Sequence, residues 1–324
     1  MKRAWLLACA TAVAVAATGT VVAAQDDPPP SRELVIATGG PGGVYQAYGT
    51  AFARALAGAG QPATVRGTGA SVENLRLVAA GEADIGFSLA DSAAAAVEGQ
   101  PPFAARLPVV ALARLYDNYT HLVVPAGSPV RAVTDLRGLR VSTGAAESGT
   151  EVISERLLRL AGLDPDVDVV RHRLGVAESA QRLRDGRLQA FFWSGGLPTE
   201  AIRQLAATTQ IRLVDLAGAV DALRAAHGEF YTQLSIPASA YGLGQHVATV
   251  GVPNYLVVAG SMADDTAYRV TSVLFDAKPD LVAAHPEARR LNPRTAISTW
   301  PVPLHPGASR YYREQKPGWR AGSR

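Results

Sequence analysis

Short apolar runs alternate along the chain with stretches in which apolar residues recur every three or four positions. The runs predict strands at 34–37, 63–66, 83–89, 109–115, 140–142, 167–171, 189–193, 211–214 and 247–258. The periodic stretches predict helices at 44–56, 71–80, 150–160, 177–184, 198–207 and 264–281. An apolar segment at 122–124, before Pro125, is expected to cross between two parts of the fold. Alternating strands and helices indicate an α/β protein built from parallel strand–loop–helix units.

The first residues have the pattern of a secretory signal. Lys2 and Arg3 precede an apolar stretch at 4–22, and small residues follow up to Ala24. This pattern predicts a signal peptide at 1–24, exported by the Sec pathway and cleaved near Ala24, which would place the mature protein in the periplasm. The stretch is also long enough to span a membrane, so an uncleaved anchor is the alternative. Residues 25–32, with three consecutive prolines, are expected to be a stiff tether.

Composition and charge exclude several classes of function. The only cysteine, Cys9, lies within the signal segment, so no disulfide framework or thiolate metal site is expected in the mature chain. The formal net charge is +3, from 31 basic and 28 acidic residues, with no dense basic run, which argues against nucleic-acid binding. The six histidines are scattered, and neither G-x-S-x-G nor H-E-x-x-H occurs. We therefore expect no enzyme activity, no metal and no cofactor.

Three loops each join a strand to the start of a predicted helix. They lie at 38–43, 68–71 and 147–150. Ligands of α/β folds bind beyond the carboxyl ends of the strands, where helix N-termini present backbone N–H groups that suit an anion. The alternative is that Ser71 and Thr150 are only helix N-caps. The glycines at 39–43 match neither G-x-G-x-x-G nor a P-loop, so nucleotide binding is not expected.

Two further segments carry candidate chemistry. Asp91 follows a strand that contains Ser88, and it either caps the next helix or faces a ligand, with Asp84 as a possible carboxylate partner. Phe191, Phe192 and Trp193 precede a glycine turn. They form either a buried strand or a ligand wall, and Trp193 is the strongest candidate for the wall.

Taken in order, several stretches resemble one known family. They are 36–45 (IATGGPGGVY), 68–75 (TGASVENL), 81–86 (GEADIG), 135–138 (DLRG), 148–150 (SGT), 191–198 (FFWSGGLP) and 303–308 (PLHPGA). In order and spacing they are similar to the TAXI family, the solute-binding subunits of tripartite ATP-independent periplasmic (TRAP) transporters. The resemblance covers residues 33–314.

The resemblance implies a bilobed periplasmic-binding-protein fold of type II-like topology, with a ligand cleft between two α/β lobes joined by a hinge. Lobe 1 would hold 33–121 and 246–324, and lobe 2 would hold 122–245. The expected ligand is a small carboxylate, either a glutamate-like amino acid, a dicarboxylate or a 2-oxoacid. The expected partners are the small and large TRAP membrane subunits, separate or fused, and the protein is expected to be a monomer.

Residue by residue, the resemblance and the loops give twelve candidate ligand-binding residues. They are Gly40, Gly43, Tyr45, Thr68, Ser71, Asn74, Ser88, Asp91, Ser148, Thr150, Trp193 and Gly195. The chain departs from the family at Gln46 and Ala47, where an aromatic residue and proline are frequent, and at Ala146 and Glu147, where Pro-Gly is frequent. Glu147 would either bind an amino group of the ligand or be an exposed first-turn charge that favours the helix dipole.

Two alternatives belong to other classes. The first is a binding protein of an ATP-driven (ABC) importer, for a ligand such as a thiamine-precursor pyrimidine, because that fold is similar. The second is a secreted enzyme or a sensor lobe, for which the sequence has no catalytic set.

Overall fold

A single mixed β-sheet runs through the protein. The computed structural model describes residues 32–316, which belong to one compact unit. The strands are β1 (Leu34–Ala37), β2 (Ala63–Arg66), β3 (Ile85–Leu89), β4 (Val109–Pro125), β5 (Arg140–Ser142), β6 (Val170–His172), β7 (Ala190–Gly195), β8 (Ile211–Leu213), β9 (Thr232–Ile236) and β10 (Val247–Ala259). Their order is β2-β1-β3-β10-β4-β7-β5-β6, with β8 beside β4 and β9 beside β10.

The sheet is parallel at its two ends and antiparallel in its centre. β1 pairs in parallel with β2 and β3, and β5 with β6 and β7, as the alternating pattern predicts. In the centre, β4 and β10 are antiparallel to each other and to their other neighbours, so the sheet as a whole is mixed. The predicted strand at 109–115 and the crossing segment at 122–124 are one strand of 17 residues. The polar residues between them keep the pairing continuous, as Tyr119 faces both Gly251 and Gly195.

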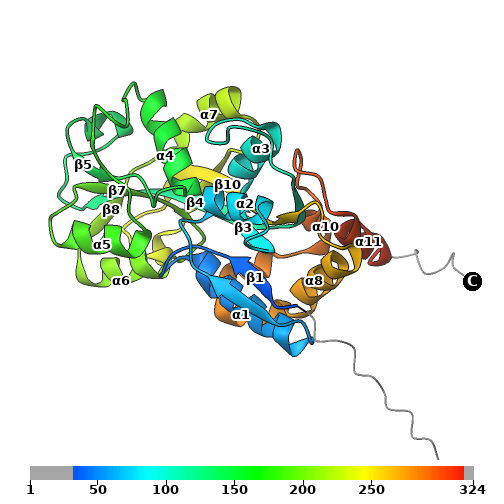
Figure 1. The fold of residues 1–324 in the computed structure, drawn as a ribbon. Helices are drawn as coiled ribbons and strands as arrows, with labels where there is room; N and C mark the ends of the chain where they lie inside the picture. Colours follow the sequence, from blue (N-terminus) through cyan, green and yellow to red (C-terminus); the bar gives the residue numbers. More distant parts are fainter. Residues whose placement is uncertain (1–31, 317–324) are drawn as a thin grey trace, which may run out of the picture. The chain divides into compact units, whose positions relative to one another are not determined.

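Helices cover both faces of the sheet (Figure 1). They are α1 (Val44–Gly58), α2 (Ser71–Ala79), α3 (Ala90–Glu98), α4 (Gly149–Leu160), α5 (Val176–Arg184), α6 (Glu200–Thr208), α7 (Val220–His227), α8 (Asp264–Asp276), α9 (Lys278–Ala284), α10 (Pro293–Ala296) and α11 (Pro306–Glu314). Short 3₁₀ turns lie at η1 (Val133–Leu136), η2 (Ala217–Ala219), η3 (Ala238–Ala240) and η4 (Pro286–Arg290). No helix in this described part is long and apolar enough to cross a membrane.

The helix prediction is wrong in one segment and incomplete in others. The predicted helix at 264–281 is two helices, α8 and α9, because Pro279 follows the break and cannot continue the hydrogen bonding of a helix. The helix α3 was expected only as the helix that Asp91 might cap, without bounds, since its run of alanines is buried on nearly all sides and shows no periodic stripe. Its N-cap is Leu89, so the interpretation of Asp91 as the cap is wrong. The helices α7 and α11 and the strand β9 were missed.

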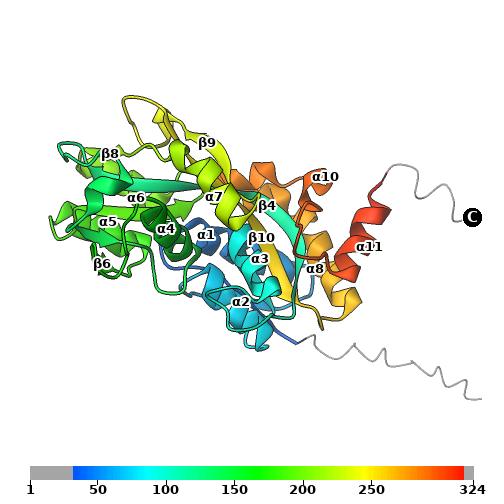
Figure 2. The ribbon, with the colours of Figure 1, turned by 90° about the horizontal axis from the view of Figure 1, so that it is seen from above.

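The strands β4 and β10 join two halves of the protein, seen side by side in Figure 2. We call the part with β1–β3, α1–α3 and α8–α11 the first half, and the part with β5–β9 and α4–α7 the second half. Along β4, pairing with β10 ends and pairing with β7 begins at Tyr119. Along β10, pairing with β9 ends at Gly251 and pairing with β3 begins at Asn254. The lobe limits expected at 121/122 and 245/246 stay a prediction.

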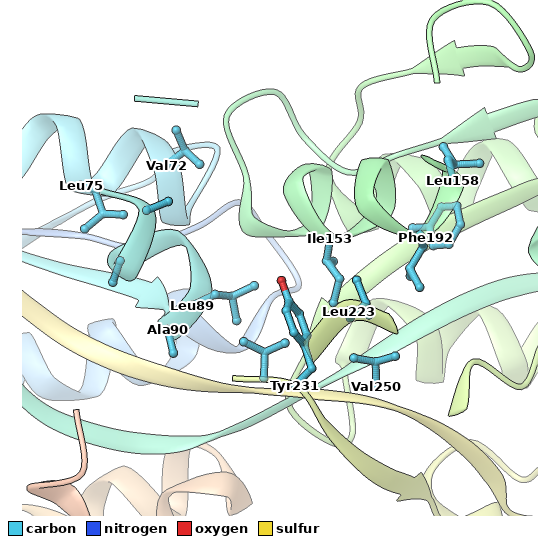
Figure 3. Close-up of a cluster of buried hydrophobic side chains, with 14 of the residues drawn as sticks. Val72, Leu75, Leu89, Ala90, Ile153, Leu158, Phe192, Leu223, Tyr231 and Val250 are labelled. Atoms are coloured by element: carbon cyan, nitrogen blue, oxygen red, sulfur yellow. The ribbon is translucent and has the colours of Figure 1, made fainter. Parts of the chain in front are cut away.

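Three apolar cores stabilise this arrangement. One lies under α1, α8 and α11 in the first half, around Tyr48 and Phe52, and another lies under α5 and α6 in the second half. The third runs from α2 and α3 across to α4 and α7. Figure 3 shows part of this shared core, where Leu89 of the first half lies near Tyr231 and Ile153 of the second half. Apolar packing therefore holds the two halves in contact in this conformation.

Candidate ligand-binding cavity

A small cavity of about 60 Å³ lies between the two halves. It is lined by Gly39, Gly40, Pro41, Gly43, Val44, Tyr45, Thr68, Gly69, Ala70, Ser71, Leu89, Tyr116, Asn118, Ala145, Ser148, Gly149, Thr150, Gly175, Val176, Trp193, Ser194 and Gly195. Nine of the twelve candidate residues are among them: Gly40, Gly43, Tyr45, Thr68, Ser71, Ser148, Thr150, Trp193 and Gly195. None of these described lining residues carries a charged side chain. The three predicted loops therefore meet at one cavity.

Four helices begin at this cavity. Val44, Ser71, Gly149 and Val176 are the first residues of α1, α2, α4 and α5, and all four line it. A helix N-terminus carries a partial positive charge and backbone N–H groups without intrahelical acceptors. The sequence reasoning found the first three and missed α5. The signal was the same there, because Gly175 lies between the strand β6 and an amphipathic helix.

Two backbone N–H groups at the N-terminus of α2 already form hydrogen bonds with the second half. The N–H groups of Val72 and Glu73 donate to the backbone oxygen of Glu147, at 3.0 and 3.1 Å. The Glu147 carboxylate pairs with Arg76 at 2.7 Å, and Glu147 is not among the lining residues. Glu147 also precedes the N-cap of α4, so its interpretation as a first-turn residue is wrong. In this conformation it joins the two halves beside the cavity.

Most of the cavity hydroxyls hold neighbouring backbone. Ser148 is the N-cap of α4 and accepts from the N–H of Glu151 at 2.9 Å. Ser71 Oγ accepts from the N–H of Leu89, and Thr150 Oγ1 accepts from the N–H of Ser194, both at 3.1 Å. The alternative that Ser71 and Thr150 are N-caps is therefore wrong, since the caps are Ala70 and Ser148.

Tyr45 is fixed by a chain of side chains beneath the cavity. Its hydroxyl bonds to Asn254 Oδ1, and its ring stacks on Phe87 with centroids 5.1 Å apart. Asn254 Nδ2 donates to Asn118 Oδ1 at 2.8 Å, and Asn118 Nδ2 donates to the backbone oxygen of Ser194 at 3.1 Å. Burial raises the pKa of the Tyr45 phenol, so the group stays neutral. The chain ties β10, β4 and β7 together.

Trp193 forms one wall of the cavity, whereas Phe191 and Phe192 are buried in the cores. The indole Nε1 donates to Thr199 Oγ1 at 2.8 Å, which fixes the ring. A Cβ atom on Gly195 would lie 2.3 Å from that nitrogen, so only glycine fits there. Of the two interpretations of this segment, the wall applies to Trp193 and the buried strand to the two phenylalanines.

His121 supports the same wall from behind. Its ring nitrogens lie 3.0 Å from the Tyr241 hydroxyl and 3.3 Å from the backbone oxygen of Trp193. Complete burial lowers the pKa of His121 to about 4, so the ring is neutral near pH 7. Within residues 32–316 no three His, Cys, Asp or Glu side chains are grouped so that they could hold a metal ion.

Two lining side chains that the sequence reasoning missed have no hydrogen-bond partner. The Tyr116 hydroxyl and Ser194 Oγ are both buried, and neither has a partner among the described residues. Tyr116 lies on β4 of the sheet centre, and Ser194 on β7 of the second half. Ser194 lies within the motif at 191–198, whereas no motif in the sequence includes Tyr116.

Asn74 and Ser88 are buried outside the cavity. Asn74 Nδ2 donates to the backbone oxygens of Thr38 and Phe87, at 2.6 and 2.8 Å, so it joins the ends of β1 and β3. Ser88 Oγ donates to the backbone oxygen of Leu89 at 3.0 Å. The amide of Asn74 is fully used, because its Oδ1 lies 2.5 Å from Thr68 Oγ1.

Asp91 is also outside the cavity, in a charged cluster on the other side of α2. Its Oδ2 accepts from Arg156 Nη1 and from the Tyr231 hydroxyl, both at 2.8 Å. Its Oδ1 accepts from the N–H of Ser92 at 2.7 Å. Asp91 belongs to α3 of the first half, and its two side-chain partners belong to the second half. Burial raises the pKa of the Tyr231 phenol well above its ordinary value. Asp84 is not its partner, as it accepts from the N–H of Val35.

Comparison with solved structures defines the class of fold. The chain has the two-half α/β fold of periplasmic binding proteins. It is similar to MatC from Rhodopseudomonas palustris with bound malate, at 15% identity over 87% of this chain and 98% of that chain, with a TM-score of 0.55. It is also similar to the binding component of an ABC phosphonate transporter from Pseudomonas aeruginosa, at 10% identity over 79% of each chain, with a TM-score of 0.55. The chain belongs to the NMT1-like family, whose model matches residues 36–315.

Proposed function

We propose that this protein is an extracytoplasmic solute-binding protein that captures a small carboxylate between its two halves and delivers it to a membrane transporter. The observation that carries the proposal is the meeting of four helix N-termini at one cavity without charged side chains. Backbone N–H groups at helix N-termini bind carboxylates without a buried arginine. Trp193 and Tyr45 supply flat apolar surface for the carbon skeleton.

The transporter is proposed to be of the TRAP type, with this chain as its TAXI-type subunit. The support is the ordered set of motifs over 33–314, three of which supply the loops at the cavity. The second candidate is an ABC importer, favoured by the likeness in fold to the phosphonate-binding component from Pseudomonas aeruginosa. The two differ in energy source, so uptake that needs an ion gradient but no ATP supports TRAP coupling. Uptake abolished by loss of an ATPase subunit contradicts it.

The ligand proposal is tested by a thermal-unfolding screen of the purified protein with amino acids, dicarboxylates, 2-oxoacids and aromatic acids. A ligand present at a thousand times its Kd stabilises the folded state by about 4 kcal/mol. We expect a carboxylate to give such a shift and the shift to shrink in Ser71→Ala and Thr150→Ala. A shift with cationic or uncharged compounds alone would retain a binding protein and contradict the carboxylate assignment.

A further inference from the structure

Two residues that line the cavity carry a buried hydroxyl group that has no hydrogen-bond partner within residues 32–316. Tyr116 is 2% exposed and Ser194 is 6% exposed, and both line the cavity. The Tyr116 hydroxyl and Ser194 Oγ make no hydrogen bond within residues 32–316. A buried polar atom without a partner costs about 1–3 kcal/mol, and nearly all such atoms in folded proteins are paired. Because both residues line one small cavity, their hydroxyls are candidates for contact with a ligand.

Three other hydroxyl groups of the cavity each make a hydrogen bond within the protein already, although a hydroxyl that accepts can still donate to a ligand. The Tyr45 hydroxyl is held by Asn254, and Ser71 and Thr150 accept from backbone N–H groups. Tyr116 is therefore the aromatic hydroxyl that is available to a ligand, although the sequence pointed to Tyr45. Its ring is held at 6.2 Å from the ring of Tyr48, nearly parallel to it. The hydroxyl is thus presented from a fixed position.

The lining also restricts the kind of group these hydroxyls can meet. No Asp or Glu side chain is among the described lining residues, so an ammonium group would have no counter-ion there. Neutral hydroxyls pair well with a neutral oxygen, since a serine or tyrosine hydroxyl both donates and accepts. The carboxylate of the ligand is left to the N–H groups at the helix N-termini.

From these observations, and resting on the proposed function, we propose that Tyr116 and Ser194 bind a second, uncharged oxygen of the solute. The solute is then a small 2-hydroxy or 2-oxo acid rather than an amino acid. Tyr116 lies on β4 and Ser194 on β7, so the ligand would contact both strands.

The test uses two matched sets of acids that differ only at the 2-position, measured by calorimetry. One set is lactate, pyruvate, propionate and alanine, and the other is malate, oxaloacetate, succinate and aspartate. In at least one set we expect the wild-type protein to bind the hydroxy or the oxo acid about tenfold or more tightly than the unsubstituted and amino acids, as loss of one hydrogen bond to a buried group predicts. In Tyr116→Phe and Ser194→Ala the ratio of the preferred acid to the unsubstituted acid should fall toward one.

The chain offers a matched control for each variant. Tyr312 and Ser154 are also buried, and neither residue lines the cavity. Tyr312→Phe and Ser154→Ala should therefore keep the wild-type ratio. The ratio is a readout of the site that a general change in stability does not move, and the unfolding midpoint without ligand confirms that each variant is folded.

The outcomes separate this inference from the proposed function. If the wild-type protein binds none of the screened acids, the proposed function fails and this inference fails with it. If it binds acids but prefers the amino acids, or distinguishes neither the hydroxy nor the oxo acid from the unsubstituted acid, only this inference is overturned. The same holds if Tyr116→Phe and Ser194→Ala both keep the wild-type ratio within twofold.

Discussion

Two polar regions lie where the halves of the protein meet, and they differ in whether their buried polar groups are paired within the protein. The cluster of Asp91, Arg156 and Tyr231 contains full charges, and each group in it has partners within the protein. No described residue that lines the cavity carries a charged side chain, and the hydroxyls of Tyr116 and Ser194 have no hydrogen-bond partner within residues 32–316. A buried group that is fully paired inside the protein needs no ligand, whereas an unpaired group on a residue that lines a cavity can be paired by one. Charge alone would therefore have pointed to the cluster of Asp91 rather than to the cavity.

The largest predicted effect breaks the charged cluster. Asp91→Ala leaves Arg156 buried without its carboxylate, and removal of one partner of a buried pair costs about 3–5 kcal/mol. We expect this loss in urea unfolding. Glu98→Gln, at an exposed position on the same helix, should change stability by less than about 0.5 kcal/mol.

The same variant tests whether the two regions are independent in function. At a temperature where Asp91→Ala is folded, the preference between matched acids should equal that of the wild-type protein, because Asp91 does not line the cavity. A changed preference would show that Asp91 acts on the ligand and that the two regions are coupled.

The second prediction concerns pH and the wall behind Trp193. Burial lowers the pKa of His121 from 6.5 to about 4, so the fold favours the neutral ring. The unfolded chain takes up a proton below about pH 6.5 that the folded protein does not take up until about pH 4. Stability is therefore present above pH 6.5 and is lost as the pH falls, by about 3 kcal/mol in total.

Unfolding by urea from pH 7 to pH 4 measures this dependence. Burial raises the pKa of Glu287, which acts in the opposite direction, so the informative quantity is the difference between a variant and the wild-type protein. His121→Gln should lower stability at pH 7 and flatten the curve, and His246→Gln, at an exposed position, should leave its shape unchanged. An equal slope in His121→Gln would disprove the assignment.

The third prediction tests contact between the halves at the cavity. A Cβ atom on Gly149 would lie 2.5 Å from Leu89 Cδ1 and 2.7 Å from Ser71 Oγ, both in the first half. Gly149→Ala should therefore oppose closure at a cost of about 1–3 kcal/mol, seen as roughly tenfold to hundredfold weaker binding of the best acid. Gly58→Ala has open space and serves as the control. Unchanged affinity in Gly149→Ala would mean that the ligand is bound without this contact.

The sequence was sufficient for the ends of the sheet and for most of the cavity. Strands followed by glycine-rich loops and amphipathic helices are local patterns, and three of the four loops at the cavity were found from them. The long strands β4 and β10 were only partly predicted, because their pairing depends on partners that are distant in the chain, such as Tyr255 opposite Arg114.

Asp91 and Tyr116 show why the site itself was harder to predict. Asp91 has the chemistry and position of a ligand-binding residue, but its carboxylate meets Tyr231, 140 residues away in sequence. Tyr116 lies inside a long strand with no motif around it, and its proposed role rests on a hydroxyl that has no hydrogen-bond partner within residues 32–316. Whether a polar group is paired depends on tertiary contacts, which a single sequence does not contain.

The smallest predicted effect concerns a second ion pair that also joins the halves. Arg76 and Glu147 lie 2.7 Å apart, as close as Asp91 and Arg156, but their side chains are 45% and 44% exposed. Water screens such a pair, so Arg76→Ala or Glu147→Gln should cost no more than about 1 kcal/mol, and the double variant should show little coupling. The double-mutant cycle, measured by urea unfolding at low and high salt, compares the two pairs directly. A coupling energy above about 2 kcal/mol would mean that the exposed pair stabilises the protein as strongly as the buried pair. Contact between the halves would then depend on Glu147 as much as on the buried cluster.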